Sequence, residues 1–217
     1  MEGNYFKYYK PSLIVPFILI VGTAISYLVA LSIPKIFQVT GITYYQFPSS
    51  SVLLIGLLHW IDKSLWRYKP FKWLFRIDDF SGRYEGKLVY TYRDDTGQIQ
   101  TGELDHIKTI CQTGSKITMN SFTKDVDGNK SSVSVNKIMC VEKTRDDKHF
   151  RLIYSYRNKG SIEKGFPAHY GTEMIKFIKK GKHKMLTGEY FTNRIPYQTK
   201  GELKELYWKS KDISHDF

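Results

Sequence analysis

Residues 82–93 read GRYEGKLVYTYR, and this stretch decides the fold of the larger part of the chain. Every second position from residue 84 to residue 92 is tyrosine, glycine or leucine, whereas positions 83, 85, 87 and 93 are charged. A period of two residues places one face of a strand inside the fold and the other face in water. The stretch therefore predicts a half-buried antiparallel β-strand.

The same pattern recurs along the rest of the C-terminal two-thirds, where turn signals such as Asp94-Asp95-Thr96-Gly97 separate short runs rich in β-branched and aromatic residues. The predicted strands are Gly82–Arg93, Ile99–Leu104, His106–Thr113, Ser115–Thr123, Ser131–Thr144, Phe150–Asn158, Ala168–Lys179 and Lys184–Thr192, with Gly201–Trp208 as a ninth or closing strand. Ile99–Leu104 and His106–Thr113 also read as one bent strand, so the count is open by one.

About eight antiparallel strands close most economically into a barrel, because closure removes the exposed edges of the sheet. A barrel of this size is filled by side chains or holds one small ligand, as lipocalins do. An outer-membrane barrel is excluded, because the strand faces carry Lys, Arg and Glu where lipid would require an apolar band.

The N-terminal third has a different composition. Residues Leu13–Ile33 lie within an uncharged run from Pro11 to Pro34 that is long enough to cross a membrane as a helix. A cleaved signal peptide is the rival interpretation, but its apolar region is shorter and ends in a small-residue cleavage site. We expect a retained anchor.

A second apolar segment, Val52–Ile61, has a short core, although the uncharged run around it extends from Ile36 to Ile61. An interfacial or re-entrant segment is the alternative to a second span. Lys and Arg collect on cytoplasmic flanks. Lys7 and Lys10 precede the first span, five basic residues follow the second up to residue 76, and only Lys35 lies between. Both termini are therefore expected in the cytoplasm.

These observations predict a membrane-anchored all-β protein. Residues 1–76 form a two-helix transmembrane anchor with basic cytoplasmic flanks, and residues 77–217 form a small, antiparallel, about eight-stranded lipocalin-like β-barrel in the cytoplasm that binds a ligand. Cys111 and Cys140 fall within predicted strands, and in a cytoplasmic domain we expect them to be reduced core residues.

The net charge is +12, and half of it belongs to the membrane flanks, where anionic lipid accounts for it. The remaining basic excess of the barrel suits a small anionic ligand, and no polymeric nucleic acid is expected because no motif for it occurs. Catalytic and phosphate-loop motifs are absent from the sequence, and the histidines and cysteines have no metal-ligand spacing. The sequence predicts a binding protein without metal or cofactor, not an enzyme.

Side chains suited to phosphates and bases gather where predicted strands begin or end. They occur in Tyr154–Lys159, in His169–Gly171 and in Gly188–Arg194. The first two share a rim by their connection, whereas Arg194 joins them only if the strand order brings it round. The alternative is that these tyrosines are ordinary core residues.

Two predicted spans, a basic linker and a strand-rich domain together resemble a known family. The motifs that carry the resemblance are the opening Gly82-Arg83-Tyr84-Glu85-Gly86, the strand end with Tyr154, Tyr156 and Asn158, then His169-Tyr170-Gly171, and finally Gly188, Tyr190, Thr192 and Arg194 at alternating positions. The layout is similar to the two-transmembrane, β-strand-rich effectors of bacterial cyclic-oligonucleotide antiphage signalling (CBASS), which are encoded beside CD-NTases.

The resemblance implies an antiphage effector of the bacterial inner membrane. Its barrel would bind a cyclic dinucleotide, and the protein would form a homo-oligomer, disrupt the membrane lipids and cause abortive-infection cell death. The hypothesis for the site is as follows: Arg157 and Arg194 contact phosphates, Tyr156 and Tyr190 lie against bases, and Thr192 and His169 make polar contacts.

Other classes remain open at this point. A membrane-tethered lipocalin-like carrier would have an apolar barrel interior and no ligand-dependent assembly. A scaffold whose barrel recruits a protein partner would expose a large apolar patch and bind no nucleotide. An enzyme is the most distant alternative, for lack of a catalytic constellation.

Overall fold

The computed structural model describes residues 5–41, 48–125, 127–160, 165, 167–195 and 197–214. The chain forms two compact units. The first contains Met1–Asp79 together with Thr113–Lys116, and the second contains Phe80–Gln112 and Ile117–Phe217. The short second segment of the first unit is a turn between two strands of the barrel, an assignment that the sequence pattern did not predict.

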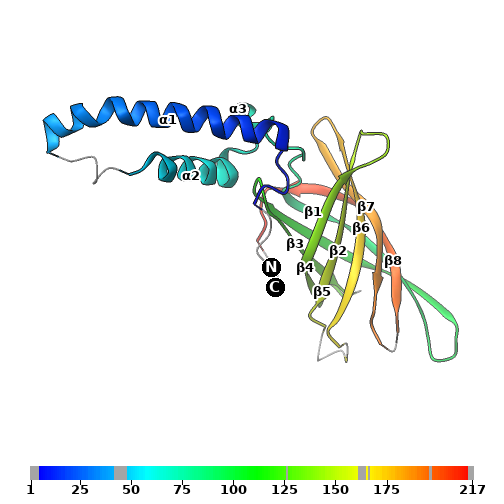
Figure 1. Ribbon diagram of the computed structural model, residues 1–217. Coiled ribbons are helices and arrows are strands. Elements are labelled where there is room, and N and C mark those ends of the chain that lie inside the picture. Colours follow the sequence, from blue (N-terminus) through cyan, green and yellow to red (C-terminus); the bar gives the residue numbers. More distant parts are fainter. Residues whose placement is uncertain are drawn as a thin grey trace. The chain divides into compact units, whose positions relative to one another are not determined.

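The second unit is a closed barrel in which each strand pairs antiparallel with the next and β8 pairs with β1 (Figure 1). Its strands are β1 Gly82–Arg93, β2 Ile99–Gln112, β3 Ile117–Lys124, β4 Lys130–Lys143, β5 Phe150–Asn158, β6 His169–Lys180, β7 His183–Thr192 and β8 Thr199–Ser210. The predicted barrel is confirmed, with eight strands.

Ile99–Leu104 and His106–Thr113, predicted as two strands or as one bent strand, form one continuous strand, β2, so the second alternative is confirmed. The alternation of inward and outward side chains continues through Asp105 without a break. Asp105 faces outward and forms an ion pair of 2.8 Å with Lys87 on β1. Joining these two segments makes the segment predicted as a ninth or closing strand the eighth, β8.

Side chains fill one end of the barrel. Phe80, which precedes β1, is fully buried and packs edge-on against Phe150 and Phe177, with ring centroids 5.5 and 4.8 Å away. The hydroxyl of Tyr84 donates to the carbonyl oxygen of Phe80 at 2.7 Å. This packing closes the interior at one end and leaves room for a ligand only toward the other.

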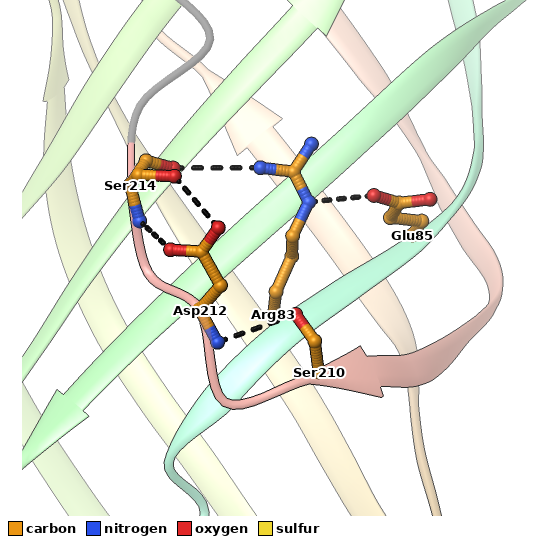
Figure 2. Close-up of polar contacts among 5 residues, drawn as sticks. All are labelled: Arg83, Glu85, Ser210, Asp212 and Ser214. Carbon is orange, nitrogen blue, oxygen red and sulfur yellow. Dashed lines mark hydrogen bonds and ion pairs between the residues drawn. The ribbon is translucent and has the colours of Figure 1, made fainter.

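The chain segment after β8 turns back across β1 (Figure 2). Arg83 donates to the carbonyl oxygen of Ser214 at 3.4 Å and to the carboxylate of Glu85 at 2.6 Å. Asp212 accepts hydrogen bonds from the backbone and side chain of Ser214, both at 2.9 Å. These contacts hold the C-terminal segment on the outer surface of the barrel.

The helices of the described chain lie in the first unit. They are α1 Pro11–Thr40, α2 Ser50–Trp60, the π-helix η2 Ile61–Leu65 and α3 Lys69–Lys72. Among the described residues, one helix, α1, is long and apolar enough to cross a membrane, by its length and composition only. The predicted second span is observed as an 11-residue helix, and at 1.5 Å per residue that helix covers about half of a bilayer core. Part of the surrounding uncharged run, residues 42–47, lies outside the described residues.

Within this unit the helices pack together and hold the turn of the barrel. The side chain of Leu54 on α2 lies over Gly22 of α1, so the absence of a side chain at Gly22 allows close approach. Asp62 is buried and accepts hydrogen bonds from Tyr9 at 3.2 Å and Ser115 at 2.9 Å, and its carbonyl oxygen accepts from the amide of Gly114 at 2.8 Å. These contacts hold Gly114 and Ser115 against Asp62 within the first unit.

The two cysteines are free, but the prediction that they are core residues is wrong. Cys111 and Cys140 are both exposed. On β2 the neighbour of Cys111, Ile110, is buried, so the alternation turns Cys111 outward. On β4 an irregularity between Asn136 and Ile138 shifts the alternation, and Cys140 faces outward between buried Met139 and Val141.

Candidate functional site: a polar cavity in the barrel

The open half of the barrel contains a cavity of about 470 Å³, a volume within the range of small-molecule sites. Aromatic, hydroxyl and charged side chains line it: Leu88, Tyr90, Tyr92, Leu104, His106, Thr123, Asp125, Ser131, Ser132, Ser134, Tyr156, Asn158, Gly160, His169, Glu173, Tyr190, Thr192, Arg194, Tyr197 and Thr199. All of these residues belong to the barrel unit.

The strand order brings most of the predicted site residues to this cavity. Tyr156, His169, Tyr190, Thr192 and Arg194 all line it. Because β5, β6 and β7 are consecutive neighbours, the end of β5, the start of β6 and the end of β7 meet at one rim, and Gly171 pairs with both Tyr156 and Thr192. Arg194, which follows β7, therefore lies at the same rim as Tyr156 and His169.

Arg157 lies elsewhere. It is exposed on β5, directly after the buried and inward-facing Tyr156, and it does not line the cavity. Two-residue alternation accounts for this, since neighbours in a strand point to opposite faces. Its predicted role in phosphate binding is untested, but the cavity geometry gives it no part.

Three tyrosines of the cavity wall lie against glycines on neighbouring strands. Tyr90 pairs with Gly102, Tyr156 with Gly171 and Tyr190 with Gly201, and in each pair the ring occupies the place where a side chain at the glycine would be. Such aromatic–glycine pairs across strands cover the exposed backbone with the ring. The rings therefore lie along the wall, and the space between them stays open.

Burial sets the protonation of two of these tyrosines. It raises the pKa of Tyr156 and of Tyr190, and the nearby carboxylate of Glu173 raises both further. The hydroxyls consequently stay neutral and remain able to donate hydrogen bonds. A neutral aromatic wall is suited to stacking against nucleobases, which every base tolerates.

A buried ion pair lies next to the cavity. The ammonium of Lys108 is 2.7 Å from Oε2 of Glu173, and it also donates to Ser121 at 2.7 Å and to Tyr154 at 3.1 Å. The Tyr154 hydroxyl donates to the same carboxylate oxygen. Lys108 and Glu173 are 0% and 3% exposed, so both charges are removed from water. Their attraction and the hydrogen bonds to Ser121 and Tyr154 offset the cost of this desolvation.

His106 faces the cavity from β2 and is 3% exposed. Its Nδ1 lies 3.0 Å from the hydroxyl of Thr123, whereas its Nε2 is buried without a hydrogen-bond partner in the described part of the chain. Burial, and then the charge of Lys108, lower the pKa of His106 well below its usual value. The imidazole is therefore neutral at physiological pH.

The rim carries the positive charge. Arg194 is partly buried and lies close enough to His169 for its charge to lower the pKa of that histidine, although burial of His169 is the larger cause. Burial lowers the pKa of Arg194, and the nearby Tyr92 and Tyr197 raise it in part. Among the described lining residues, Arg194 is the one Lys or Arg, so it is the group that an anion entering the cavity would meet.

Several cavity residues were not predicted from the sequence: Tyr90, Tyr92, His106, Ser134, Glu173, Tyr197 and Thr199. The alternation that identified β1 also places Tyr90 and Tyr92 on its inward face, so the signal for these two was present. Glu173 is different, because its partner Lys108 is 65 residues away and only the strand order unites them.

A sequence model described as "Cap15, cyclic dinucleotide receptor domain" matches residues 75–206. The match covers all of β1 to β7 and most of β8, and it includes every residue that lines the cavity. The chain belongs to the Cap15 family. Cap15 proteins are CBASS effectors, so the predicted resemblance is confirmed.

No curated protein and no solved structure matches this Cap15 chain. The family assignment makes the barrel a receptor domain rather than a catalytic one. Because the matched residues form the cavity inside the barrel, this cavity is the candidate nucleotide site.

Proposed function

We propose that this protein is a CBASS effector that binds a cyclic dinucleotide in the cavity of its barrel. The observation that carries the proposal is the coincidence of the receptor-domain match with a polar, tyrosine-lined cavity that opens beside an arginine. A cyclic dinucleotide has two flat bases and two phosphates. Tyrosine faces accommodate the bases, and a guanidinium recognises a phosphate with paired hydrogen bonds.

The roles within the cavity follow from side-chain chemistry. Arg194 contacts a phosphate, Tyr156 and Tyr190 lie against bases, and Thr192 and His169 make polar contacts near the rim. The polar groups of the cavity speak against the alternative of a lipocalin-like carrier of apolar molecules, because an apolar ligand would offer no hydrogen bond to the polar side chains that it covers, the buried Nε2 of His106 among them.

The remainder of the proposal concerns the membrane. Helix α1 and the apolar run that ends in α2 form two spans, with both termini in the cytoplasm and the protein in the bacterial inner membrane. The basic residues on either side of the two spans support this orientation. Ligand binding drives homo-oligomerisation, and the oligomer disrupts the membrane lipids and kills the infected cell.

Thermal denaturation tests the binding step. The full chain, purified in detergent micelles, is heated with each member of a panel of cyclic dinucleotides. A ligand present at 100 times its dissociation constant stabilises the folded state by about 2.7 kcal/mol. A specific upward shift with one or two members supports the proposal, and the same ligand then serves to test leakage from liposomes that contain the protein. A folded protein that no member stabilises contradicts it.

A further inference from the structure

Positive charge is distributed unevenly along the cavity. Lys108 lies beside its deep part, but an ammonium has three N–H donors, and Lys108 directs hydrogen bonds to Ser121, Tyr154 and Glu173. No donor of Lys108 remains for a ligand. The cation among the described residues that line the cavity is Arg194, which is only partly buried at the rim.

Glu173 adds a negative group to the deep part. Lys108 and Tyr154 both contact its Oε2, and the side chain lines the cavity. Its other oxygen, Oε1, can accept a hydrogen bond from a ligand. A phosphate would be repelled at this position, whereas the amino or imino group of a nucleobase would be a suitable donor.

His106 supplies a second polar group. Its Nε2 is a buried atom with no partner among the residues that the structure describes. A buried polar atom without a hydrogen bond destabilises the empty site, so a ligand group that enters the cavity gains from contacting it. The hydroxyl of Thr123 either accepts from Nδ1–H or donates to Nδ1, and Nε2 accordingly presents a lone pair or a proton.

We propose that one base of the cyclic dinucleotide enters the deep part of the barrel, where His106 and Glu173 hydrogen-bond to its polar edge, while the phosphates remain at the rim beside Arg194. This inference rests on the proposed function and deepens it. It assigns base selectivity to His106 and Glu173 and base-independent affinity to Arg194. Asp125 also lines the cavity, but its carboxylate accepts from the backbone amides of Asp127 and Asn129 within its own turn.

The walls of the barrel support the same orientation. Tyr156 and Tyr190 are each 5% exposed, and their rings lie along the wall on glycines. A flat base that enters between them contacts aromatic faces on its way to His106 and Glu173. A phosphate in the same place would lose its hydration without a free cation to replace it.

Two substitutions of His106 separate its nitrogen atoms. In H106N the side-chain amide retains a polar group at the position of Nδ1, next to Thr123, and loses the group at Nε2. In H106Q the amide reaches the position of Nε2. The control is H183N, because His183 is exposed at the start of β7 and does not line the cavity.

Dissociation constants are measured by titration calorimetry on the full chain in detergent micelles. The probes are cyclic dinucleotides that differ in one base at a time, and each variant is first shown to melt at the wild-type temperature. We expect H106N to bind the preferred dinucleotide roughly tenfold more weakly, the effect of one lost hydrogen bond, and to discriminate less between bases. H106Q should retain most of the preference, and H183N all of it. R194Q should weaken every member by a similar factor.

An H106N protein with the wild-type ranking and affinities overturns the inference and leaves the proposed function intact. A wild-type protein that binds no member of the panel overturns the proposed function and the inference together.

Discussion

The ring of Tyr156 on β5 lies against Gly171 on β6, its direct partner across the strands. A Cβ atom at Gly171 would come within 2.3 Å of Cζ of Tyr156 and 2.6 Å of the carbonyl oxygen of Phe191. The glycine therefore provides the space in which the ring lies along the cavity wall. The backbone oxygen on the other side leaves an added methyl group no room to retreat.

We predict that G171A weakens ligand binding and lowers stability, because the ring of Tyr156 is pushed into the cavity. Overpacking of this kind costs about 1–3 kcal/mol. Melting temperature and dissociation constant are measured on the same preparation. T172A is the matched control, because Thr172 is the next residue of β6 and is exposed. A G171A protein that matches T172A in both quantities would contradict the account of the wall.

Arg194 and Arg157 form a second matched pair for substitution. Arg194 lines the cavity and Arg157 is exposed on the outer face of β5. Hydrogen bonds to charged groups contribute about 1.5–3 kcal/mol, so R194Q should weaken cyclic dinucleotide binding by roughly 10- to 150-fold. R157Q should bind like the wild type. The reverse pattern, measured by calorimetry, would place the phosphate outside the cavity.

The ion pair of Lys108 and Glu173 predicts a strongly non-additive response. Removing one partner of a buried pair leaves an uncompensated charge and costs about 3–5 kcal/mol. K108M and E173Q should each lower the free energy of unfolding markedly, and the double variant K108M/E173Q should lose less than the two single losses combined. Denaturant unfolding of the four proteins gives the coupling directly. Simple additivity would show that the two groups do not interact.

The buried histidine predicts a dependence of stability on pH. The pKa of His106 lies well below 6.5 in the folded protein because of burial and the charge of Lys108, so the unfolded chain binds the proton more readily. Stability is thus fully present above about pH 6.5 and falls as the pH drops below it, by up to about 1.4 kcal/mol per pH unit.

Comparison with H106N isolates this contribution. Unfolding free energies of both proteins between pH 5 and pH 8 should diverge only below about pH 6.5, with the wild type showing the steeper decline. His169 also has a lowered pKa, through burial and the charge of Arg194, but it is present in both proteins and cancels in the difference. Parallel curves would mean that His106 is not held neutral.

The barrel was predictable from the sequence because its signal is local. In β1 tyrosine, glycine or leucine occupies every second position from residue 84 to residue 92, and the turns contain glycine and aspartate where the chain reverses. The two segments predicted for β2 left out Asp105, the residue between them. Asp105 faces outward and pairs with Lys87 across the strands.

The site was only partly predictable. Its residues come together because of the order of the strands in the barrel and because their side chains point to the inner face. The motifs at the end of β5, the start of β6 and the end of β7 identified five lining residues. Arg157, in contrast, was chosen by its residue type, although its position in the alternation turns it outward. Lys108 illustrates the opposite failure. A lysine in a strand suggests an exposed face, and only its place between inward-facing His106 and Ile110 indicates that it is buried.

The most direct test of the central claim asks whether the ligand occupies the interior of the barrel. Ser134 lines the cavity from β4 and is 8% exposed, so S134F places a ring in the space that a nucleotide would take. Calorimetry compares the full-length wild type and S134F in detergent micelles with the cyclic dinucleotide that stabilises the wild type. The account predicts that the wild type binds and that a folded S134F protein does not. Equal affinities would contradict it, since the ligand would then bind elsewhere.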